Sequence, residues 1–358
     1  MKKLVKLILV LVVISFISIW AIPAPAQMPK LPAKPKPIEW RIQAMFAPGI
    51  EDYKFFAEYP QGFCQLVKNM SGGRLIIKPY GSGELVPMVE SFDATGKRAI
   101  EGYVAASAYW GRKIPVAMFG WGLPFTISGI QQVNTYLGEY EGGIIPLMRE
   151  AYKPFNLYLL TIGFSAGDAP LFSKKRVYKV ADYKGLKVRC IGMAADVLTK
   201  VGAAITYLPS PEIYSGLESG VIDAANWGGV DSMVDLKFHE VTNYILYPPL
   251  TGMVTDEVTV NMDAWSALPD DLKAIVQQAA ITYVNSHGQW LQLRNTIMLE
   301  KLLKTGKIKE VCTMPPEEAE KLRAVAIDIV REFSKKDSYT AKAFKNFEGY
   351  LKLIGMIK

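Results

Sequence analysis

One helical pattern of about 37 residues, from Pro269 to Thr305, constrains the fold of this chain more than any other feature. Gly288 is its only interruption. An unbroken α-helix rises 1.5 Å per residue, so a helix of this length would reach roughly 50 Å, which exceeds the width of a typical domain of about 150 residues. We therefore expect a protein with two lobes and one long helix that spans both.

Strands and helices alternate along the rest of the chain. Residues 38–46, IEWRIQAMF, alternate apolar and polar side chains as a half-buried strand does. A helix that ends near residue 71 and a second strand, residues 74–80, come next, and further strands are expected at 157–163, 186–192 and 203–209. This alternation predicts an α/β protein with mainly parallel sheets wrapped by helices. In such sheets, ligands bind outside the carboxyl ends of the strands.

The N-terminal segment has the features of a secretory signal peptide. Three lysines at positions 2, 3 and 6 precede an apolar run over residues 7–22, and Ala24-Pro25-Ala26 supplies the small residues of a cleavage site. We expect cleavage near Ala26 and a periplasmic location, with residues 27–37 as an extended tether rich in proline and lysine. The alternative is an uncleaved membrane anchor, because the run lacks acids and Trp20 could lie at a membrane interface.

The composition excludes several classes of protein. Loss of residues 1–26 would lower the formal charge from +7 to +4, and the lysines are scattered among carboxylates, so we expect no nucleic-acid partner. About 330 remaining residues are too many for one typical core and indicate two lobes. Three cysteines and two histidines, without the spacing of a metal motif, argue against a disulfide scaffold and against a structural zinc site.

Several segments together resemble the solute-binding subunits of tripartite ATP-independent periplasmic (TRAP) transporters, in the dicarboxylate-binding superfamily. They are MSGGRLIIKPYGSGELVP (70–87), ESFDATGKRAIEG (90–102), DYKGLKVR (182–189), EIYSGLESGVIDAANWGG (212–229) and VNMDAWSALPDDLKAIV (260–276). Within that superfamily the chain looks most like the branch that binds 2-oxo and 2-hydroxy monocarboxylates.

The resemblance implies a two-lobed periplasmic binding protein fold, type II-like, that closes over a small organic carboxylate. It also implies two membrane partners, the small and large permease subunits. We predict that lobe I comprises residues 38–160 and about 250–285, and that lobe II comprises 161–249 and about 286–358 with the C-terminal helices.

The resemblance also implies particular ligand-binding residues. Arg189 matches the family's ligand-binding arginine, and its planar guanidinium can offer two parallel N–H donors to a carboxylate. Trp227 matches a tryptophan that forms a flat wall of the pocket. Tyr109 corresponds to a member of an aromatic pair and could donate its hydroxyl to the ligand, although core packing is an equally good explanation for it.

Related proteins hold a metal ion between ligand and protein, at positions that here are Gly167, Asn226 and Thr251. None of these supplies an anionic oxygen, which sodium and calcium prefer, so we expect no metal, and the small residues would leave room for a bulkier or aromatic acid. If the alignment is shifted, Asp168, Asp231 or Asp256 could hold a sodium or calcium ion instead, but we expect each of them to be a solvated loop acid.

Two other functions stay open from the sequence. The first is an exported enzyme, which the lack of a nucleophile elbow or a phosphate-binding glycine loop disfavours. His239 and His287, the two histidines, are expected on helices as surface or packing residues. The second is a sensor subunit that presents a ligand to a receptor; its fold and pocket would be the same.

Overall fold

The computed structural model describes residues 36–140, 142–166, 169–252 and 254–357. The predicted signal peptide, its cleavage site near Ala26 and most of the tether lie outside these residues. Pro37–Lys358 form one compact unit. None of the helices in the described part of the chain is both long enough and apolar enough to cross a bilayer.

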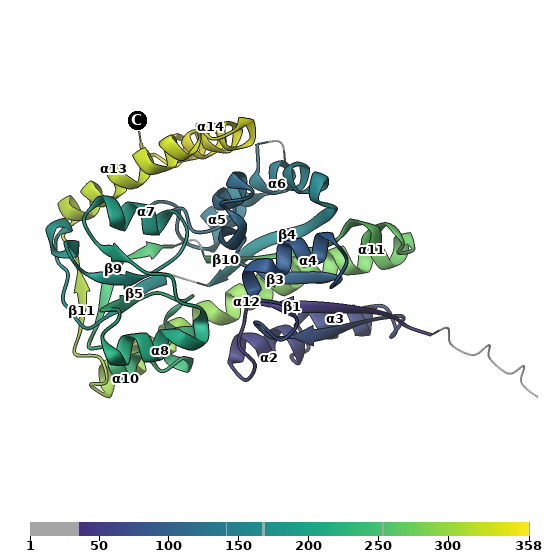
Figure 1. Ribbon diagram of the computed structural model, residues 1–358, viewed down its shortest axis with the longest axis horizontal. Helices are drawn as coiled ribbons and strands as arrows, with labels where there is room; N and C mark the ends of the chain where they lie inside the picture. The colour runs from purple at the N-terminus through teal and green to yellow at the C-terminus, as the bar shows by residue number, and fades with distance from the viewer. Residues whose placement is uncertain (1–35, 141, 167–168, 253, 358) are drawn as a thin grey trace, which may run out of the picture. The chain divides into compact units, whose positions relative to one another are not determined.

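The first lobe, lobe I, is built on a five-stranded sheet in the order β2-β1-β3-β10-β4. Helices cover this sheet (Figure 1). Its elements are β1 (Ile38–Ala44), α2 (Glu51–Ala57), α3 (Phe63–Met70), β2 (Leu75–Tyr80), the 3₁₀ helix η1 (Met88–Glu90), α4 (Ser91–Gly96), β3 (Gly102–Ala105), η2 (Ser107–Trp110), η3 (Pro115–Phe119), α5 (Ile130–Leu137), α6 (Ile144–Tyr152), η4 (Lys153–Phe155), β4 (Leu157–Ala166), β10 (Val254–Asn261) and α11 (Met262–Ser266).

The second lobe, lobe II, is built on a six-stranded sheet in the order β11-β9-β5-β8-β6-β7. Apart from β9, its strands have five residues or fewer, and β7 and β8 have two residues each. Its elements are β5 (Ala169–Ser173), η5 (Val180–Tyr183), β6 (Lys187–Arg189), α7 (Met193–Lys200), β7 (Ala204–Ile205), α8 (Ser210–Ser219), β8 (Ala224–Ala225), α9 (Val230–Asp235), α10 (Phe238–Val241), β9 (Tyr244–Thr251) and β11 (Glu310–Thr313).

The expectation of mainly parallel sheets needs correction, because both sheets are mixed. The antiparallel pairings all involve β5 or β10. These two strands directly follow β4 and β9, at the points where the chain passes from one sheet to the other. A strand that continues from the other lobe needs no crossover helix, so it is free to run against its neighbours. The spacing of apolar residues in the sequence does not indicate whether a strand runs parallel or antiparallel to its neighbours.

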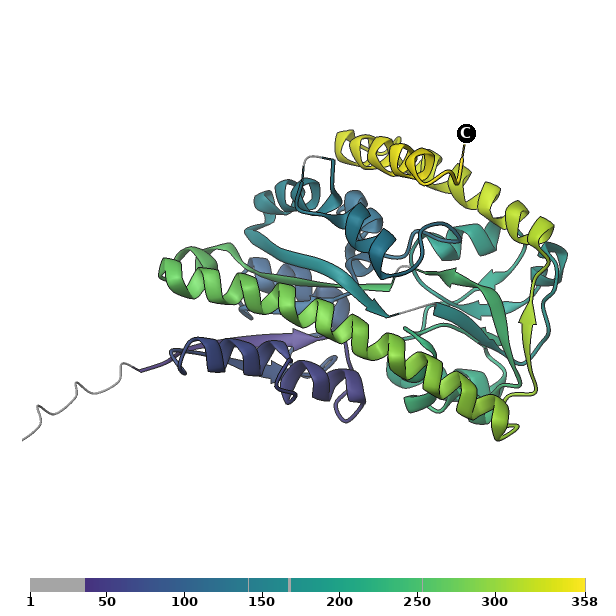
Figure 2. The same cartoon turned by 180° about the vertical axis from the view of Figure 1, so that it is seen from behind.

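The expected long helix is confirmed as α12 (Asp270–Lys304), with 35 residues. It packs on α3 and β4 of lobe I and on α9 of lobe II, and Figure 2 shows it as one continuous helix along both lobes. Gly288 does not break it. A Cβ atom at Gly288 would lie 2.1 Å from the carbonyl oxygen of Phe164 in β4, and one at Gly163 would lie 2.4 Å from the side chain of Val284. The glycines therefore allow the helix to approach the sheet closely.

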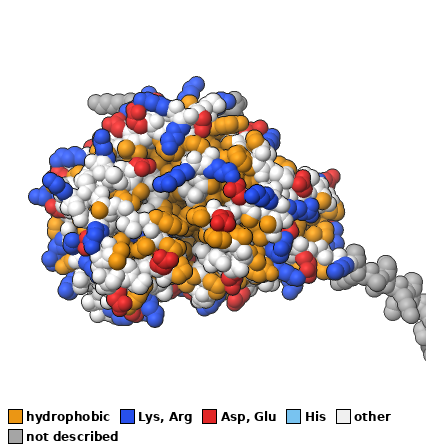
Figure 3. All heavy atoms as spheres, in the orientation of Figure 1, with side chains coloured by type: hydrophobic (Ala, Val, Ile, Leu, Met, Phe, Trp, Pro, Cys, Tyr) orange, Lys and Arg blue, Asp and Glu red, His pale blue; other side chains and the backbone are white. Residues whose placement is uncertain are grey.

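The C-terminal helices connect the lobes a second time. α13 (Pro316–Phe333) packs on α7 of lobe II, whereas α14 (Ser338–Leu353) packs on α6 and η3 of lobe I. Both helices lie along one edge of the molecule in Figure 1. On the face shown in Figure 3, basic and acidic side chains are interspersed, and apolar surface lies between them.

Candidate functional site

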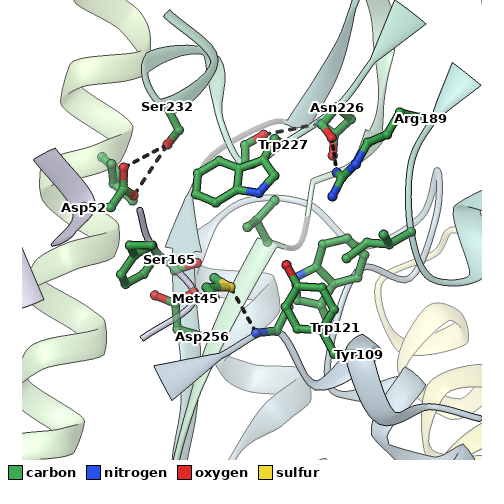
Figure 4. A pocket seen from close by; sticks show the side chains of 16 residues that line it. Met45, Asp52, Tyr109, Trp121, Ser165, Arg189, Asn226, Trp227, Ser232 and Asp256 are labelled. Carbon is green, nitrogen blue, oxygen red and sulfur yellow. Dashed lines mark hydrogen bonds between the residues drawn. The ribbon is translucent and has the colours of Figure 1, made fainter. Parts of the chain in front are cut away.

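A small cavity lies where β6 and β8 of lobe II face β1, β3 and α2 of lobe I. Its volume is about 40 Å³, room for roughly three water molecules. The lining residues are Met45, Phe46, Asp52, Ala106, Tyr109, Trp121, Ser165, Arg189, Ile191, Asn226, Trp227, Gly228, Ser232, Val254, Asp256 and Leu291. Figure 4 shows Arg189, Tyr109 and Trp121 on one side of it, and Asp52, Ser232 and Asp256 on the other.

Arg189 is the last residue of β6 and is almost fully buried, with 2 % of its surface exposed. Its Nε donates to the carbonyl oxygen of Leu208 at 3.0 Å, and its Nη1 donates to that of Asn226. Burial lowers the pKa of Arg189 from its ordinary value, yet a guanidinium stays charged under any physiological condition. None of the described carboxylates forms an ion pair with it, so a buried positive charge borders the cavity without an anionic partner.

Two further hydrogen-bond donors lie on the same side of the cavity, and both come from lobe I. Tyr109, in η2, has its pKa raised to about 12 by burial, which the neighbouring Arg189 opposes, so its hydroxyl keeps its proton. The indole Nε1 of Trp121 is buried and has no hydrogen-bond partner among the described residues. Because an unpaired buried N–H is unfavourable, the indole of Trp121 points to an acceptor in the cavity.

Asn226 and Trp227 follow β8, directly beside the arginine. The backbone N–H of Asn226 donates to the carbonyl oxygen of Arg189 at 3.0 Å, and its side-chain amide donates to the carbonyl oxygens of Pro170 and Gly228. These bonds fix the turn after the strand. Trp227, 6 % exposed, forms a flat wall of the cavity.

The opposite side of the cavity carries carboxylates that come from distant parts of the chain. Asp52, in α2, accepts a hydrogen bond from Ser232 of α9 at 3.2 Å, and this bond joins the two lobes. Asp256, in β10, lies 3.2 Å from His287 Nδ1, while His287 Nε2 lies 3.5 Å from Asp52. Burial disfavours the charged imidazole, but the two carboxylates outweigh this and raise the pKa of His287 to about 9.

This acidic cluster corrects the expectations for two of the acids. Asp256 is a fully buried strand residue, and Asp231 is fully buried in α9, so neither is a solvated loop acid. Burial and the neighbouring Asp52 raise the pKa of Asp231 to about 7, although Arg294 opposes the shift. His287 packs among aromatic rings, as expected, but it also bridges two aspartates.

Of the six residues singled out from the sequence, Arg189, Trp227, Tyr109 and Asn226 line this one cavity. Thr251 is buried at the end of β9, and its hydroxyl donates to the carbonyl oxygen of Leu123 at 3.4 Å, outside the lining. Gly167 and the acid at position 168 lie outside the described residues.

A family model matches most of the chain. Residues 54–337 match the bacterial extracellular solute-binding protein family 7, DctP. A monocarboxylate 2-oxoacid-binding periplasmic protein of Nostoc is 29 % identical over 290 residues, which are 80 % of this chain and 78 % of that protein.

Solved structures agree with this family. A TRAP periplasmic solute-binding protein of Pseudoalteromonas atlantica, with bound sodium and pyruvate, is 27 % identical, with a TM-score of 0.80 over 90 % of this chain and 96 % of the other. One from Bordetella bronchiseptica, with calcium and picolinate, is 25 % identical, with a TM-score of 0.80 over 89 % and 93 %. Family match, fold and interlobe cavity agree: the chain belongs to the DctP family of bacterial extracellular solute-binding proteins, those of TRAP transporters.

Proposed function

We propose that this protein captures a small monocarboxylate of the 2-oxo or 2-hydroxy acid class in the interlobe cavity and delivers it to the membrane subunits of a TRAP permease. One observation carries the proposal: the buried guanidinium of Arg189 borders the cavity and has no carboxylate partner among the described residues. A ligand carboxylate would supply the missing anion and accept a charge-assisted hydrogen bond.

Capture couples ligand binding to closure of the lobes. Arg189 belongs to lobe II and Tyr109 to lobe I, so a carboxylate held between them bonds both lobes at once. The bond between Asp52 and Ser232 adds an interlobe contact at the other end of the cavity. A ligand shifts the protein toward the closed state only to the extent that the closed state binds it better, and contacts from both lobes provide this difference.

The size of the cavity supports a small ligand. A cavity of this size favours a small acid over a bulkier or aromatic one. The relatives from Nostoc and Pseudoalteromonas atlantica are described with 2-oxo acids and with pyruvate. Both kinds of ligand contain a carboxylate, the group that Arg189 is expected to bind.

The residues of the cavity do not fit the ion that some relatives hold. Among the described residues, no group of three or more His, Cys, Asp or Glu side chains is placed to hold a metal. Asn226 offers only a neutral amide oxygen, and one of the two carboxylate oxygens of Asp256 is engaged with His287. Calcium takes six to eight oxygen ligands, more than these side chains supply.

Calorimetry tests the proposal. Lactate and pyruvate are titrated into the protein, and lactamide, the uncharged amide of lactate, serves as the matched control. We expect saturable heat for an acid and none for the amide, with the acid recovered unchanged by NMR. Equal binding of lactate and lactamide would refute carboxylate recognition, and chemical turnover of the acid would identify an enzyme instead.

A further inference from the structure

The cavity offers donors at one end and acceptors at the other. Arg189, Tyr109 and the unpaired indole N–H of Trp121 lie on one side, whereas Asp52 and Asp256 lie on the opposite side (Figure 4). A plain carboxylate satisfies only the first group. The second group needs a partner of its own.

At the acidic end of the cavity, which Asp52 and Asp256 form, Asp256 is the residue that most clearly lacks a hydrogen-bond donor. Its side chain is fully buried, and its Oδ1 has no hydrogen-bond partner among the described residues, whereas its Oδ2 lies 3.2 Å from His287 Nδ1. Carboxylate oxygens accept and do not donate, so the free oxygen calls for an incoming donor. Leaving such an oxygen buried without one is unfavourable.

Charge at this end points in the same direction. Asp52 and Asp256 share one histidine, and the raised pKa of His287, about 9, keeps it protonated at neutral pH. Two carboxylates and one imidazolium leave an excess of negative charge beside the cavity, which favours a donor and most of all a positively charged one.

We propose that the ligand carries a hydrogen-bond donor on the carbon next to its carboxylate, so that the cavity selects a 2-hydroxy or 2-amino acid over the matching 2-oxo acid. This inference rests on the proposed function, because the carboxylate itself must lie at Arg189. Arg189 and Asp256 line the same small cavity, and a donor on the carbon next to the carboxylate is the nearest one that such an acid can offer to Asp256. The carbonyl oxygen of a 2-oxo acid would face the acceptor Asp256 without any proton between them.

Four acids with the same three-carbon skeleton test the inference by calorimetry on the wild-type protein: alanine, lactate, pyruvate and propionate. Both enantiomers of alanine and of lactate are used, and each titration is run with a chelator in sodium-free buffer and then with calcium or sodium. Under chelation we expect lactate or alanine to bind about tenfold or more tightly than pyruvate and propionate, since a hydrogen bond to a charged group has an effect of this order. Whether lactate or alanine binds more tightly shows whether the preferred donor is a neutral hydroxyl or a charged ammonium group.

The variant Asp256→Asn assigns the preference to this residue. The amide keeps the size of the side chain but can present N–H donors, so the advantage of lactate or alanine over pyruvate should shrink to about threefold or less. Asp328→Asn, an exposed acid on α13 paired with Arg331, is the matched control and should keep the wild-type order.

Three outcomes would overturn the inference. The first is pyruvate binding under chelation as tightly as lactate and alanine, and the second is pyruvate binding best and only with an added cation, which would place an ion at the acidic end. The third is an unchanged preference in a folded Asp256→Asn protein. If that variant does not fold, the wild-type series still decides the matter. Binding of none of the four acids would overturn the proposed function as well, whereas tight pyruvate binding leaves it standing.

Discussion

Replacing Arg189 by methionine should abolish most of the affinity for the ligand. Methionine fills a similar volume but has no donor, so the bound carboxylate would lose its charged partner. Truncating one side of a buried, hydrogen-bonded charge pair costs about 2–5 kcal/mol, and the dissociation constant should rise roughly 30-fold to 5,000-fold. Arg189→Lys keeps the charge but not the planar pair of donors, so the affinity of this variant should lie between those of the wild type and R189M.

The free protein should tolerate the change. Arg189 is buried without a carboxylate among the described residues, and burial lowers its pKa, so the ligand-free fold already bears a desolvated cation. Replacing a buried charge by an apolar side chain of similar volume is often neutral or stabilising. We therefore expect an unchanged or higher melting temperature for ligand-free R189M.

Calorimetry and thermal unfolding are measured together on the wild type, R189M and the control R331M. Arg331 lies on the exposed face of α13, where it pairs with Asp328 at 2.6 Å, and its loss should leave affinity untouched. Wild-type affinity in a folded R189M protein would refute the role assigned to the arginine. A large loss of stability would mean that its carbonyl contacts, and not a ligand, explain its burial.

Three further predictions follow from the same geometry. Trp227→Phe should weaken binding about tenfold and reduce the ligand-induced change in tryptophan fluorescence; an unaltered fluorescence change would place the ligand elsewhere. Ser232→Ala removes the 3.2 Å interlobe hydrogen bond to Asp52 and should weaken binding about fivefold. Small-angle scattering of the ligand-free variant should show a larger separation between the lobes. Identical scattering from the variant and the wild type would argue against a contact that closes the lobes. The pKa of His287 is raised from 6.5 to about 9, so its contribution to the free energy of unfolding should be complete below pH 6.5 and lost as the pH rises through 9. Urea unfolding of the wild type should show this decline in stability. A decline of equal size in His287→Gln would contradict the prediction.

The features that the sequence predicts are those with a local signal. The strand at residues 38–46 and the long helix α12 are visible in the spacing of apolar side chains, and both form. Arg189, Asn226 and Trp227 lie at ends of short strands inside recognisable motifs, where ligand contacts of α/β sheets are expected. The spacing of apolar residues does not indicate that these residues share a cavity with Tyr109 from the other lobe; the resemblance implies a shared pocket, and in the tertiary structure all four line one cavity.

The acidic end of the cavity escapes sequence reasoning because its members are far apart in the chain. Asp52 lies 180 residues from Ser232, and Asp256 lies 31 residues from His287. One local clue did exist. β10 reads VTDEVTVN, and two adjacent carboxylates in a strand rich in valine indicate buried acids with partners, because unpaired buried charges are unfavourable. The neighbouring Glu257 has such partners, the hydroxyls of Tyr103 and Tyr152.

A crystal structure of the protein grown with lactate tests the central claim most directly. We predict electron density for the acid in the interlobe cavity, with its carboxylate within hydrogen-bond distance of the Arg189 guanidinium and of the Tyr109 hydroxyl. Lactate bound away from this cavity, with the guanidinium still bonded to the carbonyl oxygens of Leu208 and Asn226 and to no ligand, would contradict the account.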